Sequence, residues 1–386
     1  MKTLAIISEF NPFHNGHEYL LKKSKELTSA DLAISLMSGD YVQRGERAII
    51  DKFSRADSAM KAGFDIIIEM PVHISLQSAE YFAQGSINIL EKLNIDYLCF
   101  GIENMDPDEF LEKANILLEK KDDLEALTRK YIKSSSFTKA RYNATMEILD
   151  DDKFISSNNI LALEYIRAID RINSKIKPVP IRRLLSENTD LSLRDGKISS
   201  STAIRNNIYK DYKDHVPSYS YKSIEASKKS FGIASMDYEY GIFSYLLLLE
   251  KRPMEKIIGY EEGIDNYLSK IVRENHDSFK NFINQASTKR YTSARIRRLM
   301  LNYILDNKSY FNSYDIDFYK VLAFRENASF IFRNSKARAV LTKADYDKLS
   351  FNDRTIFTHM LDASNLYSMG QERELFRDFS KKIGRY

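Results

Sequence analysis

The chain has 386 residues, a formal net charge of +4 and 43% hydrophobic residues, a composition typical of a folded soluble protein of two or three domains. Its single cysteine, Cys99, excludes an internal disulfide framework and fits a reducing cytosol. No uncharged apolar run approaches the roughly 18 residues of a membrane span, and the first residues do not resemble a signal peptide. We therefore expect a cytoplasmic protein without a membrane segment, and the charge is too small to indicate nucleic-acid binding by itself.

Short apolar runs alternate with longer amphipathic segments over the first 105 residues. The runs predict strands at 4–7, 32–37, 65–69 and 97–100. Helical periodicity lies between them at about 14–28, 51–62 and 78–93. Continuous apolar strands that alternate with helices are typical of an α/β fold with a parallel sheet covered on both faces.

The pattern then continues with one interruption. Residues 106–150 are charged and have helical periodicity, which predicts an inserted or flanking helical hairpin. We expect a helix at 159–171, a strand at about 179–184, and a further helix near Ala203 after a run of hydroxyl side chains. Together these elements predict one α/β domain over residues 1–210.

The second half has a different character. Residues 211–235 are rich in Tyr, Ser and Lys, which predicts a linker or an irregular arm. From residue 236 to residue 386 the apolar spacing is helical and shows no convincing series of strands. We therefore predict a second, α-helical domain over residues 236–386.

The first motif with chemistry is His14-Asn15-Gly16-His17, where a predicted strand enters a helix. A helix N-terminus attracts phosphate, and Gly16 lets a nucleotide approach the backbone. His14 and His17 share one helical face, so both can stabilise charge that develops on phosphate during nucleotidyl transfer. They are the candidate catalytic residues. The alternatives are a chance pair or half of a metal site, but the other histidines form no ligand-like cluster and we predict no metal ligands.

A second motif is rich in hydroxyl groups. Ser200, Ser201 and Thr202 are N-cap candidates, and Arg205 follows one turn later. Hydroxyls and a guanidinium at a helix N-terminus can hold the β- and γ-phosphates of a nucleotide. The alternative is a plain helix cap with a surface arginine.

A third segment follows the second predicted strand and is bracketed by two glycines. Ligands in open α/β sheets bind just past the carboxyl ends of strands. Asp40, Gln43 and Arg44 are therefore candidates for substrate or phosphate contacts. The alternative is a solvated loop.

Three further positions are candidates for nucleotide contacts. Gly101 ends the fourth predicted strand and would let a base or ribose approach the backbone. Asn158 and Asn159 precede a helix and could cap it or bind an adenine edge. Arg182 and Arg183 are adjacent in a predicted strand, so only one of them faces the site, and the sequence does not choose between them.

Residues 289–298 hold five basic side chains and a tyrosine, and no acidic residue occurs from there through Leu305. Apolar residues at helical spacing predict a helix packed by one side that presents positive charge to a nucleic-acid backbone. The alternative is an ordinary solvated face. The candidate nucleic-acid contacts are Lys289, Arg290, Arg295, Arg297 and Arg298.

In this order and spacing the motifs resemble a known family. Residues 11–17 resemble the HxGH signature of the HIGH-type nucleotidyltransferase superfamily, which includes the class I aminoacyl-tRNA synthetases. Other segments narrow the resemblance to the bacterial tRNA(Met) cytidine acetate ligase family, and it covers essentially the whole chain. These segments are 38–46, 68–71, 78–83, 100–104, 157–165, 198–205 and 289–298.

The resemblance implies a Rossmann-like HIGH-type nucleotidyltransferase domain followed by an α-helical domain, and an ATP-dependent ligase. ATP, expected with Mg²⁺, and acetate would give acetyl-adenylate. The acetyl group would pass to the wobble cytidine of elongator tRNA(Met), and the product would be N4-acetylcytidine. Residues 289–298 would bind the tRNA. No obligate protein partner is implied. The implied ATP contacts are Ile7, Ser8, Glu9, Phe10, Asn11, Pro12, Phe13, His14, Asn15, Gly16, His17, Gly101, Asn158, Arg183, Ser200, Ser201, Thr202 and Arg205.

Two other functions fit part of the sequence. One is an adenylyltransferase that makes a small nucleotide cofactor, with the second domain serving oligomerisation. The other is a non-catalytic RNA-binding module. Pyrophosphate release that depends on acetate would distinguish the ligase from both.

Overall fold

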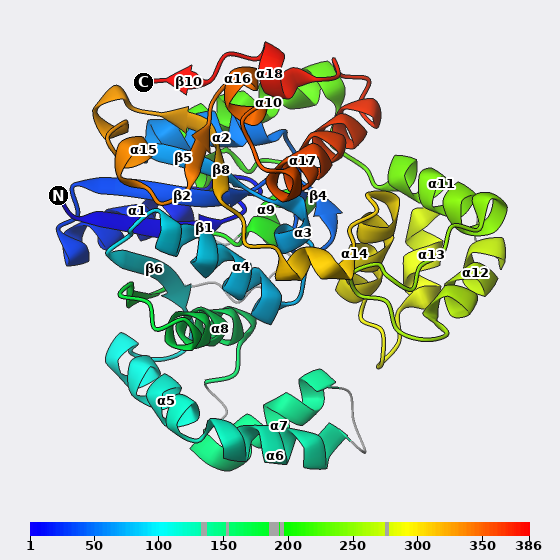
Figure 1. The fold of residues 1–386 in the computed structure, drawn as a ribbon, viewed down its shortest axis with the longest axis horizontal. Coiled ribbons are helices and arrows are strands. Elements are labelled where there is room, and N and C mark those ends of the chain that lie inside the picture. Colours follow the sequence, from blue (N-terminus) through cyan, green and yellow to red (C-terminus); the bar gives the residue numbers. More distant parts are fainter. Residues whose placement is uncertain (133–136, 152–153, 185–192, 194–196, 275–277) are drawn as a thin grey trace.

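The computed structural model describes residues 1–132, 137–151, 154–184, 193, 197–274 and 278–386, and a large mixed sheet runs through its centre (Figure 1). The strands of this sheet are β1 (Thr3–Ser8), β2 (Leu32–Ser38), β5 (Ile66–Met70), β6 (Tyr97–Ile102), β7 (Lys177–Arg182), β8 (Phe318–Phe324), β9 (Arg338–Val340) and β10 (Gly384–Arg385). They take the order β10-β8-β5-β2-β1-β6-β7, and β9 pairs with β8 outside that row. A separate hairpin is formed by β3 (Tyr41–Val42) and β4 (Glu46–Arg47).

The row β5-β2-β1-β6-β7 is parallel throughout, which confirms the predicted α/β fold. The strand order reverses beside β1, because the chain passes from β1 to β2 on one side and later returns to β6 on the other. Open α/β sheets bind ligands at such a point, outside the carboxyl ends of the strands. Pro178 and Pro180 lie in β7, at the end of the row, where a missing N–H is tolerated.

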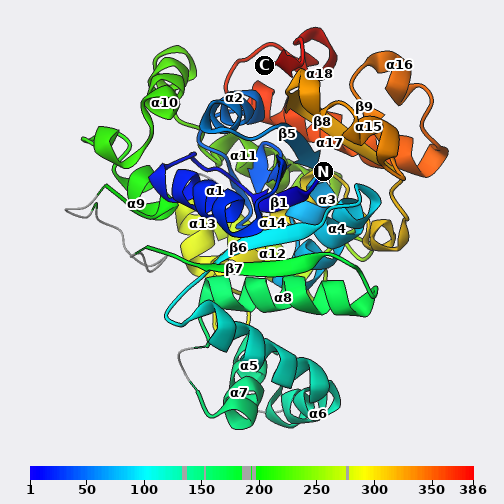
Figure 2. The ribbon, with the colours of Figure 1, turned by 90° about the vertical axis from the view of Figure 1, so that its left-hand side faces the viewer.

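Helices cover both faces of this parallel part. They are α1 (Asn15–Thr28), α2 (Lys52–Ala62), α3 (Val72–Ser75), α4 (Ala79–Lys92), α8 (Ser157–Arg171) and α9 (Ser201–Asn206). Leu21 of α1 and Met60 of α2 belong to the core on one face, and Phe82 of α4 and Ile166 of α8 belong to the core on the other. Figure 2 shows α8 alongside β7. The two faces are therefore sealed, and the strand ends are left to hold a ligand.

Where a helical hairpin was predicted as an insertion, the described residues form three helices. They are α5 (Pro107–Glu119), α6 (Lys121–Ile132) and α7 (Phe137–Leu149). These helices form a lobe beyond α8 (Figures 1 and 2). Phe110 of α5 and Leu124 of α6 join the same core as α8, so the lobe is an extension of the α/β domain.

The segment 211–235, for which a linker or an irregular arm was predicted, contains a helix. Residues 218–231 form α10 (Ser218–Phe231), which packs against α2. Ser220 donates a hydrogen bond of 2.7 Å to the carbonyl oxygen of Phe13, so this helix also supports the start of α1. The buried positions of α10 are Ser220, Ile224 and Ser227. Two of these three are serines, so the helix has no apolar stripe to reveal it in the sequence.

The prediction that residues 236–386 form a purely helical domain is only partly right. Its first part is helical and forms a lobe at the right of Figure 1, made of α11 (Asp237–Tyr245), α12 (Ile264–Glu274), α13 (Phe279–Ala286) and α14 (Ser293–Ile304). The chain then returns to the main sheet, where β8 pairs antiparallel with β5. The last helices, α15 (Ile331–Asn334), α16 (Lys343–Tyr346), α17 (Phe351–Met369) and α18 (Arg377–Ser380), lie over that end of the sheet.

A charged residue inside the sheet explains why β8 was missed. Lys320 lies in β8 and is 4% exposed, so the strand reads as an interrupted apolar run. Its ammonium group binds Glu69 of β5 at 2.8 Å and also binds Asp378 of α18. The fully buried Lys52 of α2 binds the same two carboxylates, at 2.8 Å and 2.6 Å. This buried cluster, which we call the Lys52–Lys320 cluster, fastens the end of the chain to the first domain.

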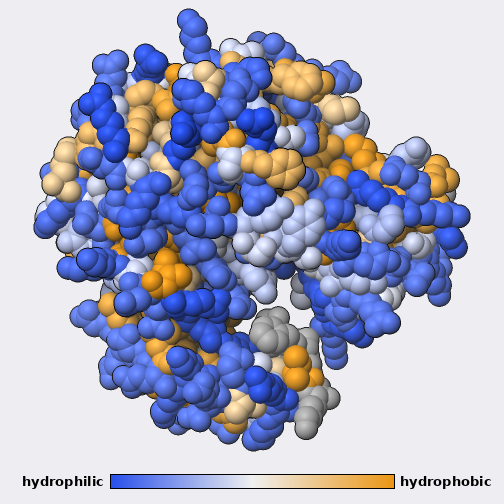
Figure 3. All heavy atoms as spheres, in the orientation of Figure 1, coloured by the Kyte–Doolittle hydropathy of each residue, from blue (hydrophilic) through white to orange (hydrophobic). Residues whose placement is uncertain are grey.

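Figure 3 shows hydrophilic side chains over most of the face in view and a hollow between the α5–α7 lobe and the α11–α14 lobe. In the part of the chain that the structure describes, none of the helices has the length and apolar character that crossing a bilayer would need.

Candidate active site

A cavity of about 590 Å³ opens at the carboxyl ends of β1, β6 and β7, the position that the strand order indicates. This volume is within the range of ligand pockets in proteins. The walls come from the end of β1, the start of α1, the loop between β3 and β4, and helices α4, α8 and α9. The start of α14 closes one side with Thr292, Ala294 and Arg298. The helical lobe therefore contributes to the cavity.

His14 caps α1 and is held in a fixed orientation. Its Nδ1 accepts a hydrogen bond from the backbone N–H of Gly16 at 3.0 Å, and its own backbone N–H donates to Nδ1 of His17 at 3.3 Å. The two rings stack with their centroids 3.8 Å apart. A ring nitrogen that accepts a hydrogen bond carries no proton, so each neutral ring carries its proton on Nε2. Both histidines line the cavity as hydrogen-bond donors.

The surroundings keep both rings neutral. Burial lowers the pKa of His14 well below its usual value, and the neighbouring His17, Arg183 and Arg205 lower it further. Burial, with a smaller contribution from Arg183, lowers the pKa of His17 to about 3. A Cβ on Gly16 would lie 2.9 Å from Cε1 of His14, so a glycine is needed there to leave room for the ring. The pair can donate to a phosphate without adding fixed positive charge.

The hydroxyl-rich motif meets the histidine motif in the cavity wall. Nε2 of His14 lies 2.9 Å from Oγ of Ser201, although the two residues are 187 positions apart. Arg205 donates to the carbonyl oxygen of Asn11 at 2.8 Å and to Oγ1 of Thr202 at 3.3 Å. Ser201, Thr202 and Arg205 line the cavity, whereas Ser200 is buried behind them and caps α9 through the N–H of Ala203.

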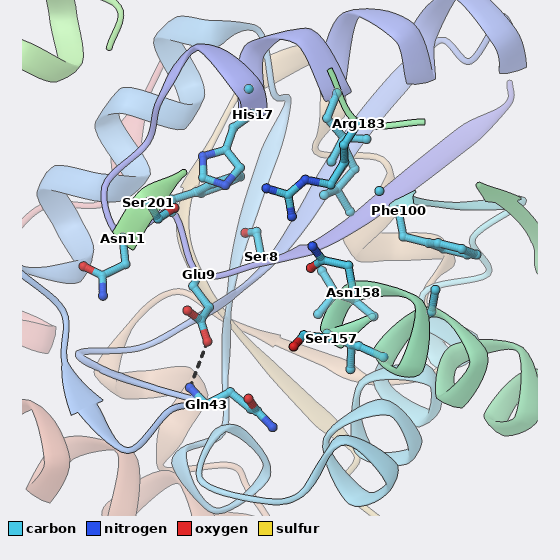
Figure 4. A pocket seen from close by; sticks show the side chains of 18 of the residues that line it. Ser8, Glu9, Asn11, His17, Gln43, Phe100, Ser157, Asn158, Arg183 and Ser201 are labelled. Carbon is cyan, nitrogen blue, oxygen red and sulfur yellow. Dashed lines mark hydrogen bonds between the residues drawn. The ribbon is translucent and has the colours of Figure 1, made fainter. Parts of the chain in front are cut away.

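A second set of polar groups lies where β6, β7 and α8 border the cavity (Figure 4). Asn158 donates a hydrogen bond to Glu103, and Arg183 lies 3.5 Å from the same carboxylate. Arg183 points into the cavity, while Arg182 is exposed at its margin, which answers the choice that the sequence left open. A Cβ on Gly101 would lie 3.0 Å from Cγ of Arg183, so this glycine makes room for the arginine.

Of the side chains between β2 and β4, some line the cavity and others are buried in the protein interior. Gln43 and Arg44 line the cavity, a position from which the predicted substrate or phosphate contacts can be made. Asp40 does not, and its candidacy as a substrate contact is not supported by its position. It is 4% exposed and accepts a hydrogen bond of 2.7 Å from the backbone N–H of Lys52, because the chain turns its side chain back toward α2.

Some residues of the first motif support the cavity from behind. Pro12, Phe13 and Asn15 are not among the lining residues. Phe13 packs on Phe10 with ring centroids 4.9 Å apart. The side chain of Asn15 donates to the carbonyl oxygens of Lys197 at 2.7 Å and Asp214 at 2.8 Å. These contacts anchor the loops that precede and follow α9.

The sequence did not predict that apolar side chains form one wall of the cavity. This wall includes Tyr19, Leu20, Phe82, Phe100, Leu161 and Tyr165. Each fits the apolar spacing of a core helix or strand, and that spacing gives no sign that one of these side chains meets a ligand. Flat and apolar side chains of this kind suit a nucleoside.

The basic segment at 289–298 differs from its prediction in two ways. The helix begins at Ser293, after the N-cap Thr292, so Lys289 and Arg290 lie before it. Most of the charges are already paired, because Arg290 and Arg295 bind Glu261 and Arg297 binds Glu46 at 3.1 Å.

Two arginines of this segment join the lobe to the first domain. Arg297 donates to the carbonyl oxygen of Arg44 at 3.2 Å, and Arg298 donates to that of Gln43 at 3.2 Å. Gly45 has a positive φ of 71°, and a Cβ there would lie 2.6 Å from the backbone nitrogen of Arg298. The backbones of the loop and of α14 are therefore in direct contact.

Replacing Gly45 with alanine should lower the free energy of unfolding by about 2–3 kcal/mol, because the methyl group would meet backbone atoms of α14 and the φ angle is strained for alanine. Urea denaturation measures this change. Gly241→Ala is the matched control, since Gly241 lies in α11 with no atom within 4 Å of an added Cβ. It should stabilise the protein by up to about 1 kcal/mol. Equal effects of the two substitutions would contradict the contact.

Comparison with known proteins agrees with this geometry. The family model described as HIGH Nucleotidyl Transferase matches residues 1–382. The tRNA(Met) cytidine acetate ligase of Caldanaerobacter subterraneus is 36% identical over an alignment of 385 positions. This alignment covers 96% of this chain and 95% of that protein. This chain belongs to the tRNA(Met) cytidine acetate ligase family. A further member of the family, from Clostridium perfringens, is 33% identical over an alignment of 394 positions, gaps included. This alignment covers 95% of each chain.

Solved structures of the family have the same fold. TmcAL of Thermotoga maritima without ligand matches with a TM-score of 0.90 and 30% identity over the full length of both chains. TmcAL of the same organism bound with α-thio ATP matches with a TM-score of 0.87 and 29% identity, again over both full lengths. The predicted HIGH-type nucleotidyltransferase fold is confirmed.

Proposed function

We propose that this protein is an ATP-dependent ligase that converts acetate to acetyl-adenylate and acetylates the wobble cytidine of elongator tRNA(Met), forming N4-acetylcytidine. The observation that carries the proposal is the 2.9 Å contact between Nε2 of His14 and Oγ of Ser201, which brings two phosphate-binding motifs onto one cavity. Relatives named tRNA(Met) cytidine acetate ligase and a relative bound with α-thio ATP support it.

ATP fits the cavity in one direction. Its phosphates would lie between the N-terminus of α1 and the N-terminus of α9, where His14, His17, Ser201, Thr202 and Arg205 supply donors. Its nucleoside would lie toward Gly101, Asn158 and Arg183, beside the apolar wall formed with α4 and α8. This direction places the α-phosphate beside the histidine pair.

The reaction would proceed in two steps. A carboxylate oxygen of acetate attacks the α-phosphorus of ATP, and pyrophosphate leaves. The Nε2–H groups of His14 and His17 stabilise the phosphate oxygens as charge develops, and Arg205 with the α9 hydroxyls holds the leaving pyrophosphate. In the second step the N4 amine of cytidine takes the acetyl group from acetyl-adenylate, and AMP leaves. Activation is needed because N4 is a weak nucleophile.

Mg²⁺ is expected to accompany ATP and would neutralise phosphate charge during the first step. It takes most of its ligands from phosphate oxygens and water in such sites. The hydroxyl groups of Ser201 and Thr202 line the phosphate end of the cavity and fit as further oxygen ligands. Among the described residues, no group of three or more His, Cys, Asp or Glu side chains gathers as a metal site.

The tRNA would lie on the α11–α14 lobe beside the cavity. Lys289 is exposed, and the side chain of Arg290 is 68% exposed and can exchange Glu261 for a phosphate. Arg297 and Arg298 are held between the domains, so we assign the first phosphate contacts to Lys289 and Arg290.

The double substitution Lys289→Ala and Arg290→Ala should weaken tRNA binding and reduce the slope of log K against log [salt] by about 1.4–1.8, since each phosphate contact contributes roughly 0.7–0.9. Filter binding at several salt concentrations measures the slope. The control is Lys336→Ala with Arg338→Ala, an exposed basic pair at the start of β9. An unchanged slope in the first variant would show that residues 289–290 are an ordinary solvated surface.

The function as a whole is tested by its product. Purified protein is incubated with ATP, labelled acetate and an elongator tRNA(Met) transcript, and the nucleosides are then separated. The proposal predicts labelled N4-acetylcytidine that requires ATP. ATP consumption without acetylated RNA would favour the alternative of an adenylyltransferase that makes a small nucleotide cofactor.

A further inference from the structure

One wall of the cavity carries the carboxylate of Glu9, which the resemblance placed among the ATP contacts and to which the first step described above gives no role. Glu9 directly follows β1 and, of the described residues that line the cavity, it is the only one with a carboxyl group. Its Oε1 accepts a hydrogen bond of 2.9 Å from the backbone N–H of Gln43, and its side chain is directed toward that residue (Figure 4). The described residues give Oε2 no hydrogen bond, so this oxygen is available to a ligand.

The negative charge of Glu9 limits which reacting group it can contact favourably. Acetate and the phosphates of ATP are anions, and a carboxylate beside them would repel both. The group in the proposed reaction that is neutral and must lose a proton is the N4 amine of cytidine. A half-buried carboxylate suits that group, because it can accept both a hydrogen bond and a proton from it.

Glu9 also lies on the side of the cavity that the helical lobe closes. Gln43, which donates to Glu9 through its backbone N–H, accepts a hydrogen bond of 3.2 Å from Arg298 through its carbonyl oxygen. Arg298 and Thr292 line the same cavity. A cytidine that belongs to an RNA held on residues 289–290 would enter from this side and would approach Glu9.

We propose that Glu9 is the general base of acetyl transfer. The inference rests on the proposed function and adds a residue to its second step. The N4 nitrogen forms a bond to the carbonyl carbon of acetyl-adenylate, and the bond from that carbon to the phosphate oxygen breaks. AMP leaves with the electron pair of that bond. The proton lost by N4 passes to the carboxylate of Glu9 and then to solvent.

The surroundings of Glu9 suit a base. Burial raises the pKa of Glu9, while Arg205, the N–H of Gln43 and Arg44 act in the opposite direction and Glu46 raises it again. Tyr165 of α8 and Arg55 of α2 also interact with Glu9 electrostatically, and Arg55 donates to the backbone oxygen of Glu9 at 2.6 Å. A carboxylate with a raised pKa is a stronger base near neutral pH.

The test separates the two steps in one variant. Glu9→Gln keeps the size of the side chain and an oxygen that can accept from Gln43, but it removes the base. Acetate-dependent exchange of pyrophosphate into ATP measures the first step. Transfer from supplied acetyl-adenylate to tRNA in a single turnover measures the second step. Glu164→Gln is the control, because Glu164 lies on the wall helix α8 but binds Arg167 at 3.1 Å and does not line the cavity.

We expect Glu9→Gln to slow transfer by about 100-fold, the size typical of a missing general base, and to slow exchange at least about tenfold less than transfer. Wild-type transfer should slow as the pH falls and Glu9 gains its proton, and the variant should lose this dependence. Transfer within about threefold of wild type, or an equal loss of both steps, would overturn the assignment. Exchange that does not need acetate in the wild type would instead contradict the proposed function.

Discussion

Replacing His14 with alanine should slow acetate-dependent pyrophosphate exchange by about 10³-fold, the upper part of the range for removing one donor from a site that stabilises developing charge. The ring is the N-cap of α1, stacks on His17 and reaches Ser201, so its loss removes a donor and also loosens the opposite wall. The rate of exchange of labelled pyrophosphate into ATP measures the effect.

The same variant should bind tRNA as tightly as the wild type, since the proposed RNA surface lies on another lobe. Filter binding provides this control. A parallel loss of tRNA affinity would contradict the division between a nucleotide cavity and an RNA surface. Exchange that survives at more than about a tenth of the wild-type rate would contradict the role of His14 in the first step.

Replacing Asp378 with asparagine should lower the free energy of unfolding by about 3–5 kcal/mol at neutral pH, the range for breaking a buried ion pair. The substitution leaves Lys52 and Lys320 charged and buried, with Glu69 as their shared carboxylate. Urea denaturation measures the loss. Asp347→Asn is the control, because Asp347 is exposed and pairs only with Lys343, at 3.5 Å, among the described residues.

The contribution of Asp378 to stability should also depend on pH. Burial alone would raise the pKa of Asp378, but the ammonium groups of Lys320 and Lys52 hold it below its usual value. A carboxyl group whose pKa is lower in the folded state stabilises the protein at pH values above its pKa in the unfolded state, about 3.9. This stabilisation is lost as the pH falls toward and through the pKa of the folded state. The difference between wild type and Asp378→Asn should therefore shrink below about pH 4. A constant difference down to acid pH would contradict this account.

The sequence predicted the parts of the fold that depend on local pattern. Strands buried on both faces are continuous apolar runs, and β1, β2, β5 and β6 were found for that reason. The elements that were missed depend on distant partners. Lys320 is stable inside β8 only because Glu69 and Asp378 come from other parts of the chain, and α10 buries Ser220 and Ser227 against the first domain.

The same distinction applies to the cavity. The histidine and hydroxyl motifs were found because a helix N-terminus has a local signature in sequence. The choice of Arg183 over Arg182 and the burial of Asp40 depend on which way a side chain turns in the assembled fold. The contact of Arg298 with Gln43 joins segments 255 positions apart, so a basic residue that looked like an RNA contact became part of the cavity wall.

The most direct test of the central claim is exchange of labelled pyrophosphate into ATP by the purified protein without tRNA, measured with and without acetate. The account predicts exchange that appears only when acetate is present and that is lost in His14→Ala. Exchange at the same rate without acetate, or no exchange at any acetate concentration, would contradict a ligase that works through acetyl-adenylate.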